Sequence, residues 1–122
     1  MLFPEAQVRI WLYTDPTDMR KSYDGLSILV KQKLADDPVS GQLFVFINRK
    51  RTQMKVLYFD RSGYCIWSKR LEQGRFHFRS SDRGKLSLSW TDLKLIIGNR
   101  PANPVFFPSQ LSLTFEDFAV VA

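Results

Sequence analysis

The side chains best suited to chemistry in this sequence are cationic, and they gather in its middle. Residues 49–85 contain 11 of the 18 Lys and Arg residues but 3 of the 12 Asp and Glu residues. This segment therefore carries a net charge of +8 and the remainder −2, within a total of +6. Such segregation predicts a localised surface for a polyanion, and nucleic acid is favoured over a surface that is merely solvated.

The predicted DNA-binding surface consists of eight cations. They are Arg49, Lys50, Arg51, Lys55, Lys69, Arg70, Arg75 and Arg79. The first three occupy a predicted hairpin tip, from which they can reach phosphates on either side. Phe76 and Phe78 alternate with the last two arginines, a pattern that fits base stacking in single-strand binding. Burial of both rings in the core is the favoured alternative.

The sequence offers little for catalysis. Metal-dependent DNA cleavage needs two or three carboxylates around divalent cations, whereas Asp60 suits a turn and Glu72 lacks the lysine two residues on that marks a nuclease strand. His77 is the only histidine, which argues against a metal site or an activated nucleophile. No Gly-rich phosphate loop occurs. We therefore expect no enzymatic activity, no metal and no cofactor.

The single cysteine and the absence of long apolar runs indicate the compartment. Cys65 excludes an internal disulfide, lies between aromatic residues, and is expected to be a small core residue in a reducing compartment. No apolar run approaches the roughly 18 residues of a membrane helix. The first residues lack the features of a signal peptide. The sequence predicts a cytoplasmic protein without a membrane span.

Two strands, at residues 54–60 and 64–71, are predicted to form the hairpin that positions the lysines. Asp60 and Gly63 favour a three-residue loop closed by Gly63 at positive φ. In that register Lys55 faces Lys69. Like charges directly opposite each other destabilise a sheet, so these two side chains must either splay apart or hold an anion.

The remaining elements complete a single α+β domain with a largely antiparallel sheet and about two helices. Strands are predicted at residues 8–13 and 85–89, and the apolar run at 43–47 predicts a central strand covered on both sides. Helical periodicity spans residues 18–34. A short second helix is predicted from an N-cap at Thr91 to Gly98.

Both faces of the predicted hairpin are apolar. The predicted register places Leu57, Phe59, Cys65 and Trp67 on one face and Val56, Tyr58, Tyr64 and Ile66 on the other. One helix can cover one face, so the other requires either the C-terminal segment or a second protomer, and a homodimer is possible. The tail, residues 99–122, is rich in Phe and Leu and is expected to pack on the core.

Two further cations stand at the start of the first predicted helix. Arg20 and Lys21 would oppose the helix dipole there. An anion bound at that end would remove the conflict, as would a helix that begins after them.

Four blocks occur in an order that matches a known family. They are MRKSYDGL at residues 19–26, PVSGQLFVF at 38–46, KVLYFD at 55–60 and KRLEQGRF at 69–76. The chain thereby resembles, over about residues 8–98, the small TnpB-type (Orf2-like) accessory protein of the IS-sixty-six family of bacterial insertion sequences. Phe78 and Arg79 stand where that family pattern has Trp-Pro.

The resemblance implies a protein needed for transposition but distinct from the catalytic transposase. Our leading hypothesis is a non-enzymatic accessory factor that binds DNA through the cationic segment. The alternative is a protein adaptor that docks onto the transposase without touching DNA. A nuclease is the least favoured hypothesis.

Overall fold

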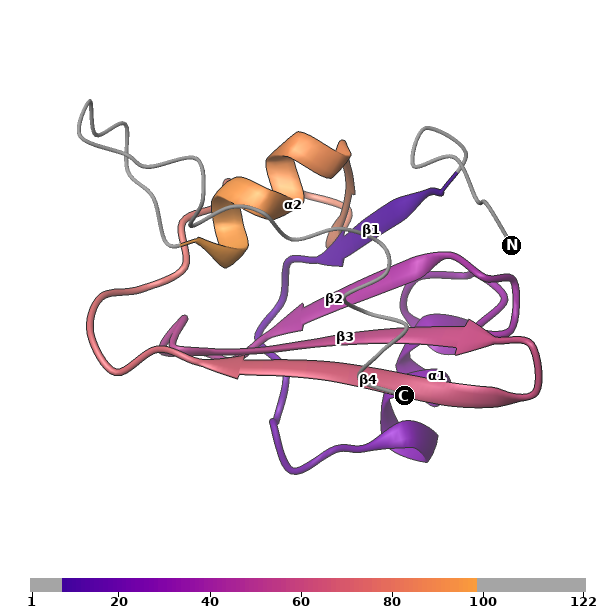
Figure 1. Cartoon of the computed structure of the whole chain (residues 1–122). Coiled ribbons are helices and arrows are strands. Elements are labelled where there is room, and N and C mark those ends of the chain that lie inside the picture. Colours follow the sequence, from indigo (N-terminus) through magenta and orange to yellow (C-terminus); the bar gives the residue numbers. More distant parts are fainter. Residues whose placement is uncertain (1–7, 99–122) are drawn as a thin grey trace.

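The computed structural model describes residues 8–98, which form a five-stranded sheet with one helix on each side (Figure 1). The elements in order are β1 (Ile10–Tyr13), α1 (Tyr23–Gln32), β2 (Leu43–Ile47), β3 (Gln53–Asp60), β4 (Gly63–Arg70), β5 (Lys85–Leu88) and α2 (Trp90–Ile97). The strand order is β4-β3-β2-β1-β5. The β1–β2 pair is parallel and the other pairs are antiparallel. The predicted α+β fold with a largely antiparallel sheet is confirmed.

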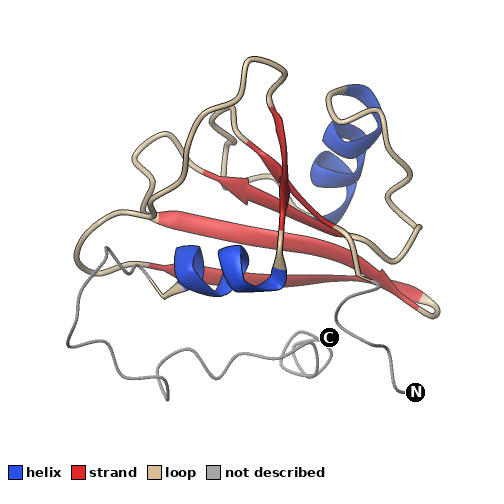
Figure 2. Ribbon diagram, turned by 90° about the horizontal axis from the view of Figure 1, so that it is seen from above, coloured by secondary structure: helices blue, strands red, loops and turns tan. Residues whose placement is uncertain are grey.

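The two helices lie on opposite faces of the sheet (Figures 1 and 2). Leu26 and Val30 of α1 pack on Phe44 and Phe46, while Leu93 of α2 belongs to the apolar cluster on the other face. All five residues of β2 are buried because both of its faces are covered. Since α2 covers the second face of the sheet, that face needs no second protomer to bury it.

Both helices begin at residues other than those predicted. α1 starts at Tyr23, after the N-cap residue Ser22, so Arg20 and Lys21 precede the helix and do not oppose its dipole. α2 is capped by Ser89 rather than Thr91. The Ser89 hydroxyl accepts the Asp92 N–H at 3.0 Å, and the Asp92 carboxylate accepts the Ser89 N–H at 2.9 Å, which is a capping box.

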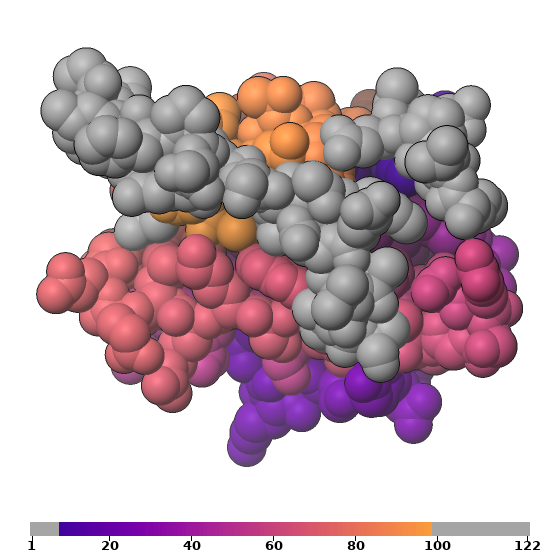
Figure 3. Space-filling view, viewed as in Figure 1, coloured from indigo at the N-terminus to yellow at the C-terminus, as the bar shows by residue number. Residues whose placement is uncertain are grey.

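A long connection, residues 71–84, carries the chain from β4 at one edge of the sheet to β5 at the other. It projects at the left margin of the molecule in Figure 3. Phe76 anchors it, with a side chain that is 0% exposed in the cluster beneath α2. The expectation that the tail packs on the core concerns residues 99–122, which lie outside the described residues.

Candidate nucleic-acid interface

The β3–β4 turn sets a register different from the predicted one. Asp60 pairs with Gly63, so the loop contains two residues, and Arg61 adopts a positive φ of 55° in place of Gly63. Lys55 therefore faces Ser68, and Lys69 faces Met54. The predicted Lys55–Lys69 pair is wrong. Because paired residues share a face and successive residues alternate, the two lysines lie on opposite faces of the sheet.

The shift in register also changes which apolar side chains of the hairpin share a face of the sheet. Leu57 and Ile66 pack in the cluster beneath α1, whereas Val56, Cys65 and Trp67 belong to the cluster beneath α2. The predicted face sets are therefore wrong, although both faces are apolar as expected. Cys65 is 5% exposed, which confirms it as a core residue, and burial raises the pKa of its thiol.

Lys55 and Lys69 each connect the sheet to the end of a helix. The Lys55 Nζ donates to the carbonyl of Lys21, just before α1, at 2.8 Å. The Lys69 Nζ donates to the carbonyl of Ile97, the last residue of α2, at 3.0 Å. Both ammonium groups are thus engaged within the fold, and neither lies in an apposed pair that could hold an anion.

The turn between β2 and β3 presents two cations to solvent. Asn48 organises it, because its Oδ1 accepts the N–H groups of Thr52 at 2.8 Å and Gln53 at 3.0 Å. Arg49 and Lys50 at the tip are exposed. Neither forms an ion pair with any residue between 8 and 98.

Arg51, although in the same turn, points into the protein. Its guanidinium carbon lies 3.9 Å from the centroid of the Phe78 ring, and its Nη1 donates to the Phe78 carbonyl at 3.2 Å. Its own carbonyl accepts the Phe76 N–H at 2.7 Å. Arg51 therefore fixes the connection 71–84 to the turn. Phe76 is buried and Phe78 lies half-buried under Arg51, which favours the core interpretation of both rings over base stacking.

The remaining predicted cations differ in their environments. Arg70 pairs with Glu72 at 3.1 Å, but the two side chains are 67% and 79% exposed, so solvent screens the pair. Arg75 and Arg79 are exposed and form no ion pair within the described part of the chain. Arg75 directly precedes Phe76, which bonds to the β2–β3 turn, and so lies near Arg49 and Lys50.

Arg20, absent from the predicted set, joins these cations. It lines a concavity of 690 Å³ together with Arg49, Lys50 and Gln53, between the β1–α1 connection and the β2–β3 turn. The Arg20 guanidinium forms an ion pair with the Asp18 carboxylate at 2.7 Å. The hydrogen bonds from Arg20 lower the pKa of Asp18 to about 2. The one sequence signal that singled out Arg20 was its place at the start of a predicted helix, where a cation opposes the helix dipole.

We call this surface the cationic end and define it as Arg20, Arg49, Lys50, Arg70 and Arg75. It lies where β2 and β4 end and β3 begins, at the left of the sheet in Figure 1. Asp18 and Glu72 offset two of its charges, so three remain uncompensated among the described residues. Arg51, Lys55 and Lys69 are held within the fold, and Arg79 faces a separate groove beside α2.

The described residues contain little that could support metal or nucleophile chemistry. Between residues 8 and 98, no three or more His, Cys, Asp or Glu side chains come together in a way that could hold a metal ion. Asp60 lies at the β3–β4 turn, as predicted, and Glu72 pairs with Arg70. No helix in this part of the chain is long and apolar enough to cross a membrane.

Comparisons with known proteins give a consistent result. The sequence model of the family described as IS66 Orf2-like protein matches residues 8–103. Uncharacterized protein y4hO of Sinorhizobium fredii (strain NBRC 101917 / NGR234) is 36% identical over 97 residues, 79% of this chain and 84% of the relative. Uncharacterized protein y4jC of the same strain is 34% identical over 97 residues, 80% of this chain and 83% of the relative. No solved structure matches the chain.

Proposed function

Because the chain belongs to the IS66 Orf2-like family of insertion-sequence accessory proteins, we propose that it assists transposition in the cytoplasm by binding DNA without catalysing strand chemistry. The four sequence blocks identified the family correctly. The proposed contact surface is the cationic end, which replaces the predicted set of eight cations.

One observation carries this proposal: Arg49, Lys50 and Arg75 gather at one end of the sheet without a carboxylate partner among the described residues. Cations that neutralise phosphates release counterions, and this release drives binding that is largely independent of base sequence. The residues sit on turns and on an irregular connection, which suits contact with the phosphate backbone more than readout of base edges.

The expected salt dependence follows from the number of cations. If three to five phosphates are neutralised, log K should fall against log salt with a slope of about −2.7 to −4.5. Between 50 and 200 mM salt the affinity would then drop about 40- to 500-fold. Element-end and random duplexes should bind with similar affinity.

The test compares two variants of equal charge change. Arg49→Ala/Lys50→Ala removes two cations of the cationic end, and Lys31→Ala/Lys33→Ala removes two exposed cations around the far end of α1. In fluorescence anisotropy titrations, the first should bind about tenfold more weakly, with a slope shallower by about 1.8. The second should behave as the native chain. Absence of binding at 50 mM salt, or equal losses in both variants, would reject the proposal.

A second candidate function is a protein adaptor that docks onto the transposase. The observation that favours it is an apolar groove of 390 Å³ beside α2. A pull-down with the transposase, repeated after nuclease treatment, separates the two functions, because a complex bridged by DNA would be lost. A homodimer remains a further proposal, which analytical ultracentrifugation tests directly.

A further inference from the structure

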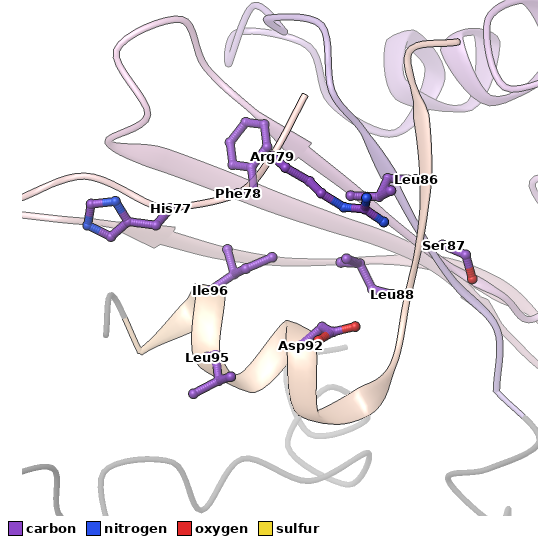
Figure 4. Close-up of a pocket in the computed structure, with 9 residues that line it drawn as sticks. All are labelled: His77, Phe78, Arg79, Leu86, Ser87, Leu88, Asp92, Leu95 and Ile96. Atoms are coloured by element: carbon purple, nitrogen blue, oxygen red, sulfur yellow. The ribbon is translucent and has the colours of Figure 1, made fainter. Parts of the chain in front are cut away.

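The groove beside α2 has an apolar floor, and its lining contains two charged residues, Arg79 and Asp92. Leu86 and Leu88 of β5 and Ile96 of α2 line it. Figure 4 shows Leu88 and Ile96 pointing into the space between α2 and the connection 71–84, with Arg79 reaching across toward Leu86. Leu95 at the rim is 43% exposed, one of four large apolar side chains so exposed among the described residues. At 390 Å³ the groove has room for a few side chains but not for a folded domain.

The charges around the groove select the ligand. Arg79 forms no ion pair with any carboxylate between residues 8 and 98, and it extends into the groove toward Leu86 (Figure 4). Asp92, which also lines the groove, already accepts the Ser89 N–H with its carboxylate at 2.9 Å. A matching segment therefore carries apolar anchors next to acidic groups, with its acids directed toward Arg79.

The chain itself contains such a segment. Phe115 and Phe118 flank Glu116 and Asp117, the two acids of residues 99–122. Gly98, the C-cap of α2, is separated from Phe115 by 16 residues. A linker of that length spans at most about 50 Å. It is therefore long enough to return to the groove that α2 helps to form.

We propose that the groove lined by Leu86, Leu88 and Ile96 is the docking site for the chain's own segment 115–118. The two rings fill the apolar floor, and the adjoining carboxylates pair with Arg79. Because the segment belongs to the same chain as the groove, its effective concentration there can reach the millimolar range, which makes it a strong competitor. An external partner would bind in the groove only by displacing this segment. The inference concerns a different surface from the cationic end and does not depend on DNA binding.

A disulfide trap tests the proposal in the full-length chain. Cys65→Ala removes the native thiol, and Ala119→Cys places a new one directly after the segment while keeping both rings. Leu95→Cys supplies the partner thiol at the groove. The matched control is Ile28→Cys on α1, across the sheet and 47% exposed against 43% for Leu95. Equilibration in glutathione buffers then measures the effective concentration of each thiol pair.

The pair at the groove should show an effective concentration at least tenfold above that of the control pair. Adding Phe115→Ala/Phe118→Ala should abolish the difference, and Arg79→Glu should reduce it several-fold. Equal effective concentrations, or disulfides formed only between chains, would overturn the proposal.

A second measurement avoids the engineered thiols. A fluorescein-labelled peptide of residues 113–119 should bind the Phe115→Ala/Phe118→Ala chain at least tenfold more tightly than the intact chain, because the groove is vacated. Equal binding to both chains, or binding to neither, would also overturn it.

Discussion

The substitution Lys69→Met tests whether Lys69 stabilises the fold or contacts DNA. The Lys69 Nζ lies 3.0 Å from the carbonyl oxygen of Ile97 at the end of α2. The last carbonyls of a helix lack partners within the helix and carry the negative end of its dipole. The ammonium therefore satisfies an acceptor and offsets that charge. Methionine keeps most of the apolar stem but removes both effects.

The expected cost can be worked from the contact. A hydrogen bond to a charged group contributes about 1.5–3 kcal/mol, and a cation at a helix C-terminus about 0.3–1 kcal/mol. The two effects describe the same contact and do not add. Lys69 is only half-buried, so partial screening by solvent lowers the contribution further. We expect Lys69→Met to lower the free energy of unfolding by about 1–2 kcal/mol.

Urea denaturation followed by tryptophan fluorescence measures this loss, with Lys50→Met as the matched control. Lys50 is exposed at the tip of the β2–β3 turn, and its replacement should change stability by less than about 0.5 kcal/mol. In DNA titrations the order should reverse, so that Lys50→Met weakens binding more than Lys69→Met. A Lys69→Met chain that unfolds at the native urea midpoint yet binds DNA poorly would refute the reasoning.

Three further predictions concern stability. Phe76→Ala should lower the free energy of unfolding by about 3–5 kcal/mol, because the ring is fully buried. A much smaller decrease in urea denaturation would contradict the core position of the ring and favour base stacking instead. Ser89→Ala should cost about 1 kcal/mol by removing half of the capping box, whereas Thr91→Ala should be near neutral in the same assay. Burial of the Asp36 carboxylate acts to raise its pKa, but hydrogen bonds from the Asp37 N–H, Gln42 and Lys85 outweigh it, so the pKa is lowered. Asp36 therefore stabilises the fold above the unfolded pKa of about 3.9 and loses that contribution as pH falls through the folded value. Asp36→Asn should destabilise at pH 7 and flatten the acid decline of the urea midpoint; a decline as steep as that of the native chain would contradict the assignment.

The positions of the strands could be predicted from the sequence because apolar and β-branched runs mark them, but the hairpin register could not. Gly63 was the natural residue for a positive φ, yet Arg61 adopts that conformation and shortens the loop by one residue. Because side chains alternate along a strand, one residue of slip moved every side chain of one strand to the other face. The observed register places Leu57 opposite Ile66 beneath α1 and Val56 opposite Trp67 beneath α2.

The separate roles of the cations could not be predicted from composition. Lys55 and Lys69 bond to carbonyls 34 and 28 residues away, and Arg51 covers a ring 27 residues away. These contacts exist only once the helices and the connection 71–84 are in place. Arg49 and Lys50 could be predicted as exposed because a turn tip has no neighbour to cover it. The N-cap of α2 was predicted at Thr91 and lies at Ser89, although Ser89 and Asp92 have the spacing of a capping box.

The position of β1 in the sheet has a consequence for synthesis of the chain. β1 is the first described strand, but it pairs with β2 about 30 residues later and with β5 about 75 residues later. The β2–β3–β4 meander uses neighbours in sequence and can assemble early, whereas closing the far side costs more chain entropy. A nascent chain that has not yet emerged past Leu88 leaves one side of β1 unpaired. Ribosome pausing or truncation before that residue should thus release a species prone to edge-to-edge aggregation.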